Sequence, residues 1–419
     1  MPLSYRQGRF SIYFIAFLAL LVTVSLIRYP QVAFDASLSG LRIWWDIVFP
    51  ALLPFFIFSQ VLIGLGVVHF LGILLEPVMR PVFNVPGAGS FVMAMGLASG
   101  FPIGAVLTTK LRQQGLCNKV EGERLISFVN TADPLFMFGA VAVGMLHRPE
   151  TGLIIAVAHY LSTITVGLLM RFYKAKEETK KTGAFQHEKE PYSRLNRALK
   201  ALVEARKKDA RPIGQVLGDS VRDSMNTLIL IGGFIMLFSV IIAITEVVGF
   251  AGIVSGLFAV VLDKVGMSTS LAPAFYSGLL EIDLGCQAAS IELQAPLEQR
   301  IAAISAIIAW SGLSVHAQVA SIISSTDMSI VPYIFARFLH AILACIYSLL
   351  LFGPLGSFIA IEDQAMPVFL QTIPRGNLNY VFERTAFMGW RAIIILLTLL
   401  IIAVIFELYQ KKMSAKVKA

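Results

Sequence analysis

The sequence predicts an all-α integral membrane protein with two inverted-topology repeats, re-entrant hairpins and interrupted helices in about 8–12 membrane segments. The first observation is composition, because 57% of the 419 residues are hydrophobic and only 14% are charged. The second is a duplication, since the order of hydrophobic spans and breaks recurs after a shift of 178 residues. The third is that each copy holds two hydrophobic segments broken by glycine, proline or acids, which is typical of secondary transporters.

The composition also limits the function classes. The net charge of +8 lies mainly in loops and tails, where membrane topology explains it, so we expect a lipid bilayer and no nucleic acid as partner. The cysteines Cys117, Cys286 and Cys345 form neither a disulfide framework nor a metal-ligand pattern. A phosphate-binding glycine loop and a nucleophile–histidine–acid set are both absent from the sequence. We therefore expect a protein that is not an enzyme, has no catalytic residues and needs no cofactor or metal ion.

The first apolar run, 10–27, follows Arg6 and Arg9 and lacks a small-x-small cleavage site, so it predicts an uncleaved membrane span. A short polar loop is expected up to Arg42. The first repeat is then expected to begin with a span at 44–66 and a shorter segment at 67–83. Two interrupted segments follow, 88–110 with a break near 99–104 and 123–146 with a break near 130–134. A last span is expected at 151–172.

A basic linker at 174–211 separates the two repeats. Its Arg/Lys/Glu-rich portion from Arg194 to Lys208 predicts an amphipathic surface helix. The second repeat reads as five segments, at 221–245, 247–265, 268–290, 300–325 and 330–352. A mixed-charge loop then leads to a final span at 390–408 and a basic tail.

These segments group into a domain order along the chain: an N-terminal span and loop at 1–39, repeat one at 40–173, the linker at 174–217, repeat two at 218–352, and the last loop, span and tail at 353–419. The excess of Lys and Arg predicts that the N-terminus, the linker and the C-terminus are all cytoplasmic. Each repeat then crosses the membrane an odd number of times, so the two repeats have opposite orientations.

Two of the four breaks predict the tips of re-entrant hairpins. In repeat one the break is Ser99-Gly100-Phe101-Pro102-Ile103-Gly104, and two glycines with a proline cannot continue a regular helix cheaply. The matching stretch of repeat two begins at Ser277-Gly278 and contains Glu281 and Asp283.

The other two breaks interrupt helices, near 130–134 and 310–316. Half-helix N-termini present free N–H groups and the positive end of the helix dipole, which suit a carboxylate or a phosphate. The predicted substrate-binding residues are the small and polar residues at the breaks: Ser99, Gly100, Pro102, Gly104, Asn130, Thr131, Ser277, Gly278, Ser311 and Gly312. The predicted ion- or proton-coupling residues are the titratable ones, namely Asp133, Glu281, Asp283 and His316.

Each of these features also has a purely structural interpretation. Glycine and proline are frequent in membrane helices, so a single break is equally compatible with a kink. Asp133 could cap a helix that starts at Pro134, and His316 could be a hydrogen-bonded core histidine. Arg124 and Arg300 begin corresponding helices and could anchor them at the membrane surface. Four breaks at matched positions favour the functional interpretation.

The residues around the breaks resemble a known family. The repeats, with their breaks at Ser99-Gly100-Phe101-Pro102 and Ser277-Gly278, look like the paired gate (nucleoside-recognition) domains of sporulation integral membrane proteins of spore-forming Firmicutes. The segments Leu52-Leu53-Pro54-Phe55 and Phe128-Val129-Asn130-Thr131 add to this resemblance, which covers most of the chain, from 40 to 352.

The resemblance implies a role in spore formation. It implies a protein of the outer forespore membrane, made in the mother cell, that moves dipicolinic acid toward the developing spore. Gate domains are also similar to the core of concentrative nucleoside transporters. Those carry a Gln-Thr-Glu triplet at the first hairpin tip, where this sequence has Phe101-Pro102-Ile103-Gly104, and the difference speaks against a nucleoside substrate.

Dipicolinate is a small planar dianion, and opposed half-helix ends with hydroxyl and amide side chains could bind its two carboxylates. Glu281 and Asp283 beside a dianion require protonation, a cation or an orientation away from it. We expect an alternating-access carrier of this anion. A carrier of nucleosides or other small solutes, and a non-transporting membrane scaffold or assembly factor, are the alternatives. The coupling ion and the oligomeric state, including a homo-oligomer, stay open.

Overall fold

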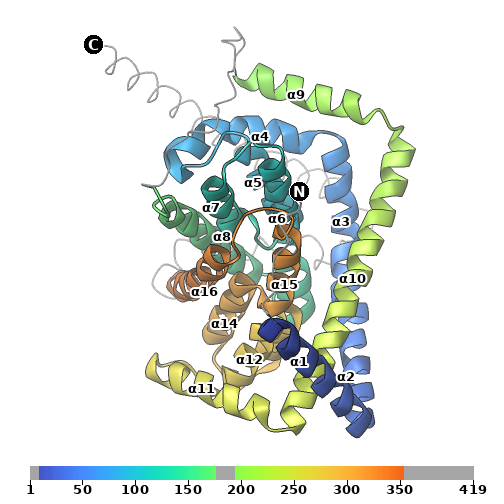
Figure 1. Ribbon diagram of the computed structural model, residues 1–419, viewed down its shortest axis with the longest axis vertical. Helices are drawn as coiled ribbons and strands as arrows, with labels where there is room; N and C mark the ends of the chain where they lie inside the picture. The colour runs from blue at the N-terminus through green and yellow to red at the C-terminus, as the bar shows by residue number, and fades with distance from the viewer. Residues whose placement is uncertain (1–8, 176–193, 353–419) are drawn as a thin grey trace, which may run out of the picture.

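A computed structural model describes residues 9–175 and 194–352, and all regular elements in these ranges are helices (Figure 1). Within them, five helical segments are long and apolar enough to cross a membrane: Pro30–Leu62, Thr151–Met170, Ile213–Val247, Leu297–Ile323 and Val331–Phe352. The all-α membrane class is therefore confirmed. The predicted final span at 390–408 and the basic tail lie outside the described residues.

The N-terminal part differs from the prediction in one place. Helix α1 (Arg9–Arg28) matches the first expected span, but the expected polar loop up to Arg42 is wrong, because α2 (Pro30–Ile43) occupies it. This helix packs on α10, since Ser239 of α10 donates a 2.7 Å hydrogen bond to the Ala36 carbonyl. Gly40 lies so close to Ser239 that a Cβ atom would stand 3.0 Å from the serine Cβ. Small polar residues here allow close packing rather than mark a loop.

The first repeat contains each predicted segment. A wide turn, η1 (Trp44–Val48), joins α2 to α3 (Phe49–Gly64), and the chain continues as α4 (Val67–Val78), η2 (Met79–Phe83), α5 (Gly89–Ser99), α6 (Ile103–Gln113), α7 (Lys119–Val129), η3 (Phe136–Met145) and α8 (Thr151–Met170). Asn118 and Glu121 form a reciprocal capping box that starts α7. Helices α5 and α6 pack against each other on either side of their break, as the arms of a hairpin do.

The second repeat contains the same order of elements. They are α10 (Ile213–Val247), α11 (Phe250–Lys264), η4 (Thr269–Leu271), α12 (Ala272–Leu280), α13 (Ile282–Ile291), α14 (Leu297–Trp310), α15 (Gly312–Ile323) and α16 (Val331–Phe352). Here the hairpin arms are α12 and α13. They approach so closely that a Cβ atom on Gly285 would overlap the backbone of Gly278.

The corresponding helices α3 and α10 of the two repeats run in opposite directions. In Figure 1, α3 rises to α4 at the upper end of the molecule, whereas its counterpart α10 descends to α11 at the lower end. The helices α3 and α10 pack side by side. This antiparallel arrangement is what an inverted duplication requires.

The shift between the repeats is not constant. The starts of α7 and α14 are 178 residues apart, as predicted, but the breaks that end these helices are 181 apart, at Asn130 and Ser311. The hairpin breaks at Gly100 and Glu281 are also 181 apart. The pairing of Ser99-Gly100 with Ser277-Gly278 is therefore wrong by three residues. The second tip is shorter than the first, and α14 has 14 residues where α7 has 11.

The linker forms the predicted helix, α9 (Arg194–Asp209). It lies across one end of the molecule against α4, outside the bundle of long helices (Figure 1). Its exposed face carries Leu195, Leu199 and Val203 beside many basic residues, as expected of a helix at a membrane surface.

Candidate functional site

In repeat one, the hairpin tip lies directly on the break of the neighbouring helix. Gly100 has φ +68°, and a Cβ atom there would stand 2.5 Å from Asp133 Oδ2. Only glycine combines this backbone conformation with so close an approach. The side chain of Asn130 adds a second contact, because its Oδ1 accepts a 3.2 Å hydrogen bond from the Ala105 N–H in the first turn of α6.

The second repeat repeats this contact with different residues. Glu281 is the single residue between α12 and α13, and it faces the break between α14 and α15. Gly312 has φ +71°, and a Cβ atom there would stand 3.0 Å from Glu281 Cα. Each tip is thus held against the break of its own repeat.

The two halves meet across these breaks. Helix α6 of repeat one packs on α15 of repeat two, and α13 of repeat two packs on η3 of repeat one. One cavity of about 90 Å³ lies between them, and all four breaks contribute to its wall together with α3 and α10. Its lining residues are Leu52, Phe56, Phe101, Ala132, Asp133, Phe136, Ile231, Phe234, Glu281, Ile282, Asp283, Ser314, Val315 and Gln318.

The acids that line the cavity are three of the four predicted coupling residues. Asp133 Oδ1 accepts 2.9 Å hydrogen bonds from the N–H groups of Leu135 and Phe136, so it also caps the following half-helix. Glu281 caps α13 in the same way, through the N–H groups of Asp283 and Leu284. Asp283 is different, because its buried Oδ1 has no hydrogen-bond partner. The interpretation of Asp133 as a helix cap is confirmed, and the same side chain also lines the cavity.

The N-termini of the half-helices differ in whether their backbone N–H groups have hydrogen-bond acceptors within the protein. Protein oxygens already satisfy N–H groups at three of them, from Asn130 at α6, Asp133 at η3 and Glu281 at α13. The N-terminus of α15 has no side-chain cap. The hydroxyl group of Ser314, in its first turn, is buried without a partner. This end of α15 is therefore the one with unused donors.

The ten residues predicted to bind substrate lie at or next to the breaks, and none of them is in the wall of this cavity. Most are buried, whereas Ser99 and Pro102 are partly exposed. Ser277 and Gly278 lie in the last turns of α12, before the break. His316 Nδ1 donates a 2.7 Å hydrogen bond to the Gly312 carbonyl, so its core interpretation also holds.

Sequence reasoning missed a buried polar face on α16. Tyr333, Arg337 and His340 share one side of the helix and are all fully buried. Tyr333 Oη accepts a 3.0 Å hydrogen bond from Asn130 Nδ2. The rings of His340 and His159 are 4.6 Å apart, and His159 also contacts the hydroxyl group of Thr131. The available signal was spacing, since residues four and three apart stand on one face inside an apolar span.

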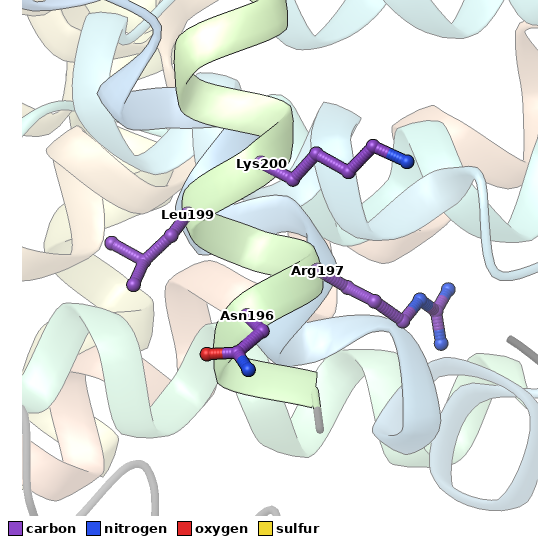
Figure 2. A pocket seen from close by; sticks show the side chains of 4 residues that line it. All are labelled: Asn196, Arg197, Leu199 and Lys200. Carbon is purple, nitrogen blue, oxygen red and sulfur yellow. The ribbon is translucent and has the colours of Figure 1, made fainter. Parts of the chain in front are cut away.

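A second, shallow hollow lies on α9, remote from the breaks. Asn196, Arg197, Leu199 and Lys200 line it. Figure 2 shows Arg197 and Lys200 extending to one side of the helix and Leu199 to the other. This split into a basic and an apolar side fits a surface helix, and it brings no group toward the cavity.

Comparison with known proteins identifies the family. A family model described as Gate: Nucleoside recognition matches residues 46–182. Over 385 residues, 91% of this chain and 90% of the other, the sequence is 44% identical to the sporulation integral membrane protein YlbJ of Bacillus subtilis (strain 168). The chain belongs to the YlbJ family. This YlbJ-family member is thus a multi-pass membrane protein of sporulation with a gate domain in its first repeat.

Further similarities are more distant. An uncharacterized protein of Alkalihalophilus pseudofirmus is 28% identical to the YlbJ-family chain over 146 residues, which are 33% of this chain and 29% of that one. The solved structure of CNTnw in an inward-facing substrate-bound state is 15% identical, with a TM-score of 0.44, and covers 82% of this chain and 87% of that one. An intermediate state of a single-residue variant of CNTnw is 14% identical, with a TM-score of 0.46, over 83% of this chain and 88% of that one.

Proposed function

We propose that the protein is a carrier of a small organic anion, with dipicolinate as substrate, that moves it from the mother cell across the outer forespore membrane. The observation that carries the proposal is that four chain breaks, two from each repeat, surround one cavity. Interrupted helices at the interface of inverted repeats form the substrate sites of secondary transporters. The 44% identity to a sporulation membrane protein supports the biological setting.

The proposed binding surface for one carboxylate is the N-terminus of α15. Its N–H groups and dipole favour an anion. The unpartnered hydroxyl of Ser314, a residue of the cavity wall that is only 1% exposed, supplies a further donor. Asp133, Glu281 and Asp283 in the same wall serve as sites for a proton or a cation that accompanies the anion.

The cavity volume bears on the mechanism. About 90 Å³ is well below the roughly 300–1,000 Å³ of pockets that enclose drug-sized ligands. In the proposed mechanism this is a narrowed conformation, and the hairpin tips withdraw from the breaks to admit solute from either side. The positive charge of α9 and of the linker supports a cytoplasmic orientation of this end and of both termini.

The first experiment is uptake of labelled dipicolinate into vesicles that contain only the purified protein, with labelled uridine in parallel. Saturable uptake of dipicolinate alone supports the proposal. Uptake of uridine alone would replace the proposed function by nucleoside transport, the alternative that the gate-domain description favours. Uptake of neither, from protein shown to be folded, favours the scaffold alternative.

A matched pair of serines locates the anion site. Ser314 and Ser305 both have buried hydroxyl groups without a partner, but only Ser314 lines the cavity. Ser314→Ala is expected to raise the KM for dipicolinate about threefold to tenfold, which is the value of one lost hydrogen bond. Ser305→Ala is expected to leave the KM unchanged. Equal effects of the two variants would contradict the proposed anion site.

A further inference from the structure

Arg337 is a fully buried cation whose hydrogen bonds are incomplete. Its side chain is 0% exposed within α16. Nη2 donates a 2.6 Å hydrogen bond to the Ser127 carbonyl, and the guanidinium carbon stands 5.5 Å from the centre of the Tyr333 ring. Nε and Nη1 are buried and have no hydrogen-bond partner. A buried guanidinium normally uses all its donors, because each unmet donor adds to the desolvation penalty.

Arg124 shows how the same protein satisfies a buried arginine. It is also 0% exposed, so the alternative interpretation of Arg124 as an anchor at the membrane surface does not fit. Nε and Nη2 both donate to the Tyr173 carbonyl, and Nη1 donates to the Asn84 carbonyl at 3.0 Å. Burial alone therefore does not explain the free donors of Arg337.

The partner of Arg337 is not an acid of the described chain. Its only hydrogen bond is the one to the Ser127 carbonyl, and no ion pair within residues 9–175 and 194–352 includes it. Ser127 lies in the last turn of α7, just before the break at Asn130. The guanidinium thus already compensates the negative end of this half-helix, while two nitrogens remain available.

The side chain of Tyr333 links Arg337 to both broken helices. Tyr333, one turn before it on α16, receives the hydrogen bond from Asn130 at the break of repeat one. The ring of Tyr333 also lies 5.3 Å from that of His316, in the first turns of α15. The cation is therefore joined through Tyr333 to the ends of α7 and α15, the second of which has unused donors.

Among the described residues, the cavity wall lacks positive charge for a dianion, and Arg337 can supply it. In the described part of the chain the cavity wall carries three acids, Asp133, Glu281 and Asp283, and no lysine or arginine. A transported dianion needs two sites with donors or positive charge. One is the N-terminus of α15. The second must come from a cation close to the breaks, and Arg337 combines that position with free donors.

We infer that Arg337 binds the second carboxylate of the transported dicarboxylate, through Nε and Nη1, when the contact between Tyr333 and Asn130 opens. This inference rests on the proposed function and deepens it, because it assigns recognition of the second negative charge to one residue. Tyr333 then acts as a positioning residue, since its ring lies against the guanidinium and its hydroxyl group meets the break.

The test compares two ligands that differ by one carboxylate, dipicolinate and pyridine-2-carboxylate, by calorimetric titration of the purified full-length protein. The wild type is expected to bind dipicolinate more tightly. Arg337→Gln is expected to weaken dipicolinate binding about tenfold to one hundredfold, the range of a lost charge-assisted hydrogen bond, and to change binding of the monocarboxylate less than about twofold. Arg337→Lys, which keeps the positive charge, is expected to retain part of the preference for dipicolinate over the monocarboxylate. It replaces the glutamine variant in the test if that variant does not fold.

The matched control is Arg124→Gln, another buried arginine, whose loss is expected to lower the melting temperature without altering the ratio of the two dissociation constants. An unchanged ratio in the Arg337 variants overturns the assignment. Equal affinity of the wild type for both ligands overturns it as well. Absence of dipicolinate uptake by wild-type vesicles overturns the proposed function itself, whereas normal uptake with an unchanged ratio overturns the role of Arg337 alone.

Discussion

The helices α8 and α16 occupy corresponding places in the two repeats but carry different groups. At a shift of 181 residues His159 corresponds to His340, and their rings are in contact. The same shift places Ala156 opposite Arg337. Duplication has therefore preserved the breaks and the histidine pair, while the buried Arg337 of α16 has no counterpart on α8. Two repeats with matching backbones thus differ in the buried side chains that they place near the breaks.

The largest expected effect, on stability, tests the close packing at glycines that both hairpins share. Gly104→Ala would bring a Cβ atom within 2.6 Å of the Val129 carbonyl, and Gly285→Ala would overlap Gly278 in the other hairpin. Both are expected to destabilise the protein by about 3 kcal/mol or more, because backbone atoms cannot yield as side chains do. Thermal melting of the purified variants measures this. Gly256→Ala, with open space around it, is the control. Full stability of either hairpin variant would refute the close packing.

The next effect compares the acids of the two repeats. Asn caps helices about as well as Asp, so Asp133→Asn is expected to shift the melting temperature by only a few degrees. Uptake is expected to fall about tenfold or more if the charge couples transport. Glu281→Gln is expected to act likewise from repeat two. Vesicle uptake at matched protein amounts measures both. Undiminished uptake in both variants would remove these acids from the mechanism and favour the scaffold alternative.

A smaller effect concerns the contact between α8 and α16. His340 Nε2 lies 3.0 Å from the His159 carbonyl and 3.0 Å from Thr163 Oγ1. The variants His159→Ala and His340→Ala are each expected to cost about 1–3 kcal/mol of stability through unpaired buried groups. Their effects are expected to be non-additive by about 0.5–3 kcal/mol, because the rings touch. Chemical denaturation of the four-member cycle measures the coupling, and strict additivity would show that the pair acts independently.

The smallest effect lies at a contact between the repeats, where α6 meets the turn between α15 and α16. Arg112 of α6 binds Asp327 through two hydrogen bonds of 2.8 Å. The Arg112 guanidinium lowers the pKa of the Asp327 carboxyl below its ordinary value. The pair therefore stabilises the protein above the unfolded pKa of about 3.9, and this contribution disappears as the pH falls through the lower folded pKa.

Because the pair is partly exposed, Asp327→Asn is expected to cost at most about 1 kcal/mol at pH 7. Melting temperatures of wild type and variant at pH 7 and near pH 3 provide the comparison. The gap between the two proteins should narrow at the acidic pH. A gap that widens there would show that another group, and not the Arg112–Asp327 pair, is responsible.

The helices could largely be predicted from the sequence because apolar runs and Gly/Pro breaks are local signals. The class, the four breaks and the surface helix at Arg194–Asp209 all followed from them. Helix α2 was missed because the stretch before Arg42 read as a short polar loop, whereas it forms a helix that packs closely on α10. A local pattern cannot show which distant helix a segment packs against.

The candidate site was predictable only in part. Asp133, Glu281 and Asp283 stood out because an acid at membrane depth is costly, and all three line the cavity. Arg337 and His340 were hidden inside the apolar run of α16. The contact of His340 with His159 depends on a register of 181, which the constant shift of 178 obscured. Lengths of tips and helices set that register, and they are known only from the folded chain.

The unbroken length of α10 has a mechanical consequence. Its 35 residues rise to about 52 Å, whereas the hydrocarbon core of a bilayer is about 30 Å thick. The helix is therefore longer than the hydrocarbon core is thick, with α9 preceding it at one end and the cavity-wall residues Ile231 and Phe234 along its length. Because α10 is one continuous element, we expect a displacement of α9 to reach Ile231 and Phe234 in the cavity wall.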